Sequence, residues 1–129
     1  MDRKAYCKWL FIVAALWNWL ASIPFFFWHD KIYARLNLQA LNYPAVLQLA
    51  MALVFVFGIG YFWVSKDISR NHDIVKLGAI AKIIAFFIFA YHYLFGSMPL
   101  VIVACGVIDL IFAILFIEFL TRNRHASRA

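Results

Sequence analysis

Two ionisable residues, Lys82 and Asp109, stand near the middle of long apolar stretches of the sequence. The stretches cover residues 74–95 and 100–120, and about 20 apolar residues in a helix are enough to cross a bilayer. A charge at the centre of such a helix costs about 2.5 to 3.5 kcal/mol on the insertion scale. Charges that persist there pair with one another or mark a path for ions, protons or polar solutes. These two residues are therefore the first candidates for chemistry.

The depths of the polar residues predict a shared polar centre. Counted from the basic ends of the spans at 1.5 Å per residue, Lys82 lies about 12 Å deep, Asp109 about 16 Å and Asn18 about 14 Å. The connection 96–99 is the tightest in the chain, so we expect the last two spans to pack side by side and Lys82 to reach Asp109. Two interpretations of the centre remain open. It is a satisfied clasp between helices, or it lines a pathway for protons or a small polar solute.

His29 and His92 form a second candidate site. Both fall near the membrane face opposite the basic ends, where two imidazoles at one depth could ligate haem or a metal. The sequence has no HxxxH, CxxCH, HExxH, GxSxG or CxxC pattern and no glycine-rich phosphate loop. We therefore expect no metal site and name no cofactor. His72, in a polar connection, and His125, in the basic tail, are expected to be solvated.

The composition is that of a membrane protein. Of the 129 residues, 67% are hydrophobic, whereas soluble domains have about 45 to 50% apolar residues. The aromatic share is 19%, and Trp and Tyr rings suit the membrane interface. The net charge of +6 comes from basic residues at the ends of apolar segments, which is typical of topology signals and argues against nucleic-acid binding.

Hydropathy and punctuation predict an all-α, polytopic membrane protein built as an up-down bundle of four transmembrane helices. We expect a single membrane domain over residues 1–129. A short amphipathic helix at 31–41 is expected to lie in the membrane interface. The four expected spans are about 9–28, 45–64, 74–95 and 100–120.

The distribution of Lys and Arg predicts the orientation. Nine basic residues fall on one side of the spans, and only Lys31 and Arg35 fall on the other. The positive-inside rule then places both termini in the cytoplasm, and we expect a bacterial inner membrane. The nine residues are Arg3, Lys4, Lys8, Lys66, Arg70, Lys76, Arg122, Arg124 and Arg128.

Several polar positions carry a family resemblance. In order they are Asn42-Tyr43-Pro44, Gln48, Gly58-Ile59-Gly60-Tyr61, Asp67, Gly78, Lys82 and Asp109. This order resembles a group of small, uncharacterised bacterial four-span membrane proteins that read NYP, Q, GxGY, D, GxxGK and ND. The chain departs from the group at Ala81 and Ile108, where the group has Gly and Asn. A looser architectural likeness links it to DoxX-like four-span proteins, some of which are associated with redox enzymes. The resemblance implies the four-span fold and supplies no activity.

The sequence favours a non-enzymatic integral membrane protein that acts as an accessory or interaction subunit. Its expected surroundings are the lipid bilayer and either a membrane-protein partner or a second copy of the chain, with no nucleic acid. One alternative is a small transporter or proton pathway through Asn18, Lys82 and Asp109. Another is a haem or quinone redox module at His29 and His92.

Overall fold

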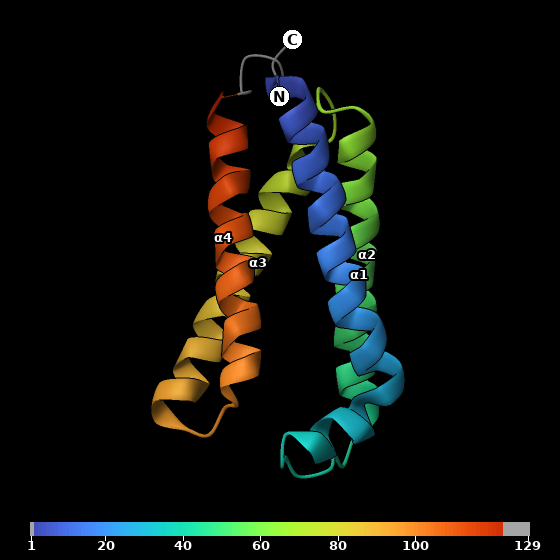
Figure 1. Ribbon diagram of the computed structural model, residues 1–129, viewed down its shortest axis with the longest axis vertical. Coiled ribbons are helices and arrows are strands. Elements are labelled where there is room, and N and C mark those ends of the chain that lie inside the picture. Colours follow the sequence, from blue (N-terminus) through green and yellow to red (C-terminus); the bar gives the residue numbers. More distant parts are fainter. Residues whose placement is uncertain (1, 123–129) are drawn as a thin grey trace. The chain divides into compact units, whose positions relative to one another are not determined.

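The computed structural model describes residues 2–122, and this part of the chain contains four helices and no strand. Each helix is long and apolar enough to cross a membrane, so the predicted all-α fold class with four spans is confirmed. Every helix is somewhat longer than its predicted span. The helices are α1 (Arg3–Arg35), α2 (Pro44–Lys66), α3 (His72–Phe95) and α4 (Leu100–Arg122), as shown in Figure 1.

The chain forms two compact units, residues 1–66 and 67–129. In the first unit α1 packs against α2, and in the second α3 packs against α4 (Figure 1). Each pair is an antiparallel hairpin, because its two helices are joined by a short connection.

Short polar or proline-containing segments start the helices. The Asp2 carboxylate accepts a hydrogen bond of 2.7 Å from the Ala5 backbone N–H and caps α1. Pro44 is the first residue of α2, where its missing N–H costs nothing. Before α4, the Pro99 carbonyl accepts the Ile102 N–H at 3.1 Å. The polar residues and prolines that interrupt the apolar stretches of the sequence therefore lie at the helix boundaries.

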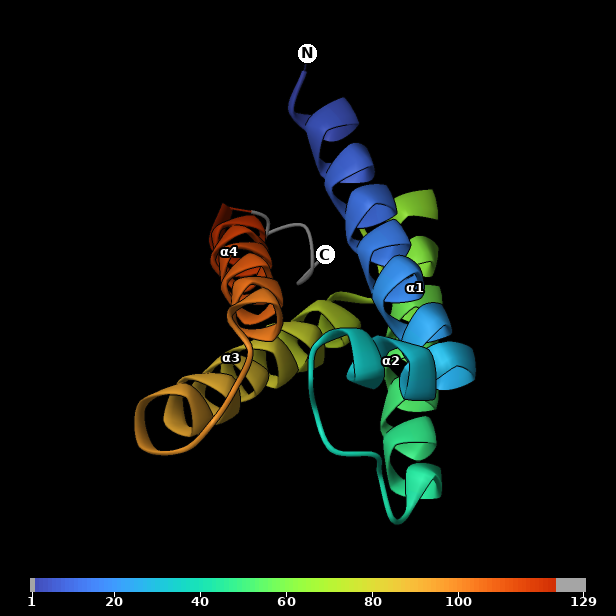
Figure 2. The ribbon, with the colours of Figure 1, turned by 60° about the horizontal axis from the view of Figure 1, so that its bottom comes forward.

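Helix α1 bends near Trp28, and a short helical segment follows the bend where the sequence predicts a helix at 31–41. Trp28 has non-helical dihedral angles (φ −126°, ψ 29°), one turn after Pro24, whose ring removes a helical hydrogen bond. The helix goes on to Arg35 and ends there, and Asn37 takes a left-handed conformation (φ 58°). Figure 2 shows this bent end of α1 leading into the loop to α2.

Each hairpin buries a narrow face and exposes large apolar side chains elsewhere. On α3 the buried residues include Val75, Ala79 and Lys82, spaced at three to four residues as one helical face requires. The buried residues of α4 include Phe116 and Phe119. Outward-facing apolar side chains suit helices surrounded by lipid.

Candidate functional site

The α3–α4 hairpin contains an ion pair between the two mid-helix charges. Lys82 Nζ donates a hydrogen bond of 2.7 Å to Asp109 Oδ1. The exposed fraction is 7% for the Lys82 side chain and 19% for that of Asp109. The contact expected from their depths and from the tight connection is therefore present. A charge-assisted hydrogen bond of this length is among the stronger polar contacts that a buried site offers.

An aromatic ring also lies close to the ammonium group of Lys82. Its Nζ lies 5.3 Å from the centre of the Phe112 ring, within range of a cation–π contact. Phe112 is buried and in turn packs near Phe116, with ring centres 6.2 Å apart. The ammonium group thus meets a carboxylate and the face of a ring, which together compensate for part of its desolvation.

A glycine lets α3 approach α4 close to the ion pair. A Cβ atom at Gly106 would lie 2.8 Å from Cδ2 of Phe89. Gly106 precedes Asp109 by one helical turn, so the close approach and the ion pair belong to the same stretch of the interface. Small residues at helix contacts commonly allow such approaches in membranes.

Asn18 is buried in the other hairpin, where it serves the contact between α1 and α2. Its Nδ2 donates a hydrogen bond of 3.0 Å to the Val54 carbonyl oxygen, and the residue is 5% exposed. The structure thus brings Lys82 and Asp109 together, whereas the side chain of Asn18 binds the backbone of α2. The predicted polar centre shared by three spans remains a prediction.

Two further side chains bind backbone carbonyls across the α1–α2 contact. Trp19 Nε1 donates to the Phe55 carbonyl at 3.2 Å, and Gln48 Nε2 donates to the Phe26 carbonyl at 3.3 Å. The Trp19 indole covers Gly58 so closely that a Cβ there would lie 2.5 Å from Nε1. In the sequence Gln48 stands out only through the family resemblance, and the structure gives it, like the small residue Gly58, a packing role.

His29 and His92 belong to different hairpins. His29 follows the bend in α1, and its Nδ1 is buried with no hydrogen-bond partner among residues 2–122. His92 is exposed near the end of α3, and its ring meets that of Tyr91 edge-on with 5.3 Å between ring centres. Over the same residues, no three His, Cys, Asp or Glu side chains gather as metal ligands. A redox site at these histidines remains a prediction.

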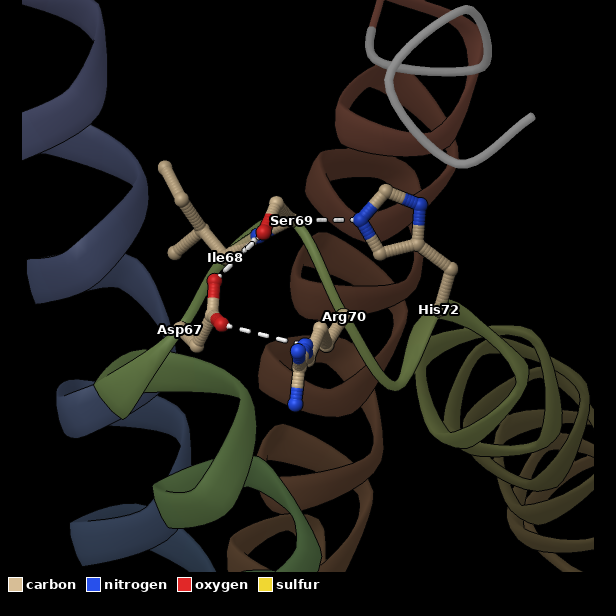
Figure 3. A network of polar contacts seen from close by, with 5 residues as sticks. All are labelled: Asp67, Ile68, Ser69, Arg70 and His72. Atoms are coloured by element: carbon tan, nitrogen blue, oxygen red, sulfur yellow. Dashed lines mark hydrogen bonds and ion pairs between the residues drawn. The ribbon is translucent and has the colours of Figure 1, made fainter. Parts of the chain in front are cut away.

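His72 corrects the expectation of a solvated histidine. It is 6% exposed, and its ring packs edge-on against that of Phe119 with 5.0 Å between centres. Nε2 lies 2.7 Å from the Ile68 carbonyl oxygen, so this nitrogen carries the proton and donates (Figure 3). A signal was present in the sequence, because His72, Val75, Ala79 and Lys82 follow the spacing of one helical face. His125 lies outside the described residues.

The connection before α3 is held by its own polar groups (Figure 3). Asp67 Oδ1 accepts hydrogen bonds from the backbone N–H of Ser69 at 3.1 Å and from its hydroxyl at 2.5 Å. Asp67 Oδ2 lies 3.5 Å from Nε of Arg70. Together with the bond between His72 and Ile68, these contacts give the connection a defined conformation.

Comparisons of the chain with models of known protein families, with curated proteins and with solved structures find no match.

Proposed function

We propose that this protein is a non-enzymatic, multi-pass protein of the bacterial inner membrane that acts as an accessory or interaction subunit. In this proposal the Lys82–Asp109 pair is a structural clasp that fixes α3 against α4. The observation that carries it is the 2.7 Å contact between Lys82 Nζ and Asp109 Oδ1. A charge that is already neutralised by a neighbour has a structural reason to be there and needs no transported ion to explain it.

The proposed orientation places both termini in the cytoplasm. In the described residues, Lys and Arg gather at the start of α1, at the end of α2, around the connection to α3 and at the end of α4. The loop after α1 has only Lys31 and Arg35 near it. This asymmetry supports the orientation through the positive-inside rule. Arg124 and Arg128, which were counted with the basic side, lie outside the described residues.

A proton or polar-solute pathway is the second candidate. It is favoured by the unequal exposure of the pair, since Asp109 keeps 19% of its side chain exposed against 7% for Lys82. A carboxylate that is open on one side can exchange a proton or a cation. The residues of this candidate are those that the sequence predicts for the pathway, Asn18, Lys82 and Asp109.

Two measurements separate these functions. For the subunit, the full chain extracted from membranes in a mild detergent is expected to migrate as a complex, with a stoichiometric membrane-protein partner or a second copy. A chain that remains alone contradicts the subunit proposal.

For the pathway, purified wild type in liposomes is expected to conduct protons or solute, and Asp109→Asn is expected to change the flux while the protein stays folded. No flux in the wild type, or no effect of the substitution, contradicts the pathway.

A further inference from the structure

Basic residues gather at one end of the α1–α2 hairpin. Lys4 and Lys8 in the first turns of α1 and Lys66 at the end of α2 are all exposed. Asp2, which caps α1, is the only carboxylate before Asp30 in the sequence, and it stands against Arg3, Lys4 and Lys8. Positive charge is therefore in excess at this end.

The contacts between α1 and α2 set the level of these residues along the hairpin. Asn18 meets Val54 and, further along α1, Phe26 meets Gln48, so a step forward on α1 corresponds to about one step back on α2. Continued to the end of the hairpin, this register places Lys8 level with the last turn of α2, which contains Lys66. Two cations on neighbouring helices thus share one level.

Two tryptophans lie just inside the lysines. Trp9 is 55% exposed and Trp63 is 57% exposed, and the same register places them level with each other. Exposed tryptophans mark the headgroup level of a bilayer, and lysines just beyond them reach the phosphates. Lys66 Nζ also lies 5.0 Å from the centre of the Phe62 ring, which keeps this cation close to the apolar surface.

The α3–α4 hairpin differs, because its basic residues up to position 122 are paired with carboxylates. Lys76 Nζ lies 3.3 Å from Oδ1 of Asp73, one helical turn away. Arg122 Nε lies 3.0 Å from Oε1 of Glu118, and Arg70 is paired with Asp67. Among residues 2–122, the surplus of positive charge is thus a property of the first hairpin.

We propose that the end of the α1–α2 hairpin formed by Lys8, Lys66, Trp9 and Trp63 is a binding site for the headgroup of an anionic phospholipid. The lysines attract the negatively charged phosphate, and the tryptophans hold the adjoining glycerol and acyl region at the interface. The attraction depends on the charge of the surrounding leaflet and applies whichever side of the membrane that leaflet occupies. The site is therefore independent of the subunit function proposed above.

The test is lipid binding to the full chain in detergent, measured by native mass spectrometry with phosphatidylglycerol and with phosphatidylcholine. The wild type is expected to bind phosphatidylglycerol on the order of tenfold more tightly. The double variant Lys8→Gln with Lys66→Gln is expected to lose that preference. Equal binding of the two lipids by the wild type overturns the proposal.

A matched control is available at the other end of the same hairpin. The double variant Lys31→Gln with Arg35→Gln changes the net charge by the same amount and is expected to keep the preference. An equal loss in both double variants shows an effect of net charge alone and overturns the proposal. If the Lys8 and Lys66 variant does not fold, the lipid preference of the wild type is measured in about 0.5 M salt instead. Screening by the salt should abolish a preference for phosphatidylglycerol that arises from exposed charges. A preference that persists unchanged in salt contradicts it.

Discussion

At the residue scale, the contacts of Lys82 explain how a charge can be accommodated within an apolar helix. Lys82 would be costly alone in an apolar helix, but it meets Asp109 at 2.7 Å and the Phe112 ring at 5.3 Å. Such a pair adds little net stability compared with apolar residues of similar volume, yet removing one partner leaves the other charge buried. We therefore expect the pair to act mainly by specifying which faces of α3 and α4 meet.

A second feature at the residue scale is the close packing of the Trp19 indole on Gly58. We expect Gly58→Ala to lower the free energy of unfolding by about 1 to 3 kcal/mol, a typical cost of overpacking. The added Cβ would lie 2.5 Å from an indole that is held by its hydrogen bond to Phe55. Thermal unfolding in detergent measures the change. Combining Gly58→Ala with Trp19→Leu should make the alanine nearly neutral, and an equally large effect of the alanine in that background would contradict the steric explanation.

At the element scale, the bend in α1 follows from Pro24 and from the non-helical backbone of Trp28. We expect Pro24→Ala to straighten the helix, because alanine restores the missing N–H and fits a helix well. Spin labels at Lys8→Cys and Lys31→Cys, with Cys7 and Cys105 replaced by serine, report the change by pulsed electron spin resonance. Their separation should rise toward the roughly 35 Å of a straight helix. An unchanged distance would show that the proline does not cause the bend.

The helices and the ion pair could be predicted from the sequence because both depend on depth along a helix. Depth along a helix is proportional to residue number, so apolar length predicts the spans and position predicts that Lys82 and Asp109 meet. His72 was misjudged because its sequence neighbours are polar, although its spacing to Lys82 places it on the buried face. The partner of Asn18 could not be predicted, since it is the backbone carbonyl of Val54 and side-chain patterns carry no signal for it.

At the scale of the whole molecule, the structure defines two antiparallel hairpins, each with its own polar contacts between helices. The first relies on side chains bound to backbone carbonyls, as Asn18 and Trp19 show. The second relies on a pair of opposite charges. The α3–α4 contact should therefore respond more strongly to loss of charge than the α1–α2 contact.

The proposed orientation makes a prediction for the whole chain. With Cys7 and Cys105 replaced by serine, Ser69→Cys lies in the connection before α3 and Asn42→Cys in the loop before α2. In spheroplasts, a membrane-impermeant maleimide should label the cysteine at position 42 and reach that at position 69 only after lysis. The reverse pattern would show that the basic side faces outward.

The central claim, that Lys82 and Asp109 form a structural clasp, is tested most directly by a double-mutant cycle. Thermal and denaturant unfolding in detergent would compare Lys82→Met, Asp109→Leu and both together. Each single change is expected to cost about 2 to 4 kcal/mol, somewhat less than at a fully buried pair because Asp109 remains partly exposed.

The matched control is the exposed pair of Lys76 and Asp73, where Lys76→Gln, Asp73→Asn and their combination should show coupling of no more than about 1 kcal/mol. For Lys82 and Asp109, the account predicts that the double variant recovers most of the stability lost by either single change. A double variant that is no more stable than the less stable of the two single variants would contradict the structural clasp.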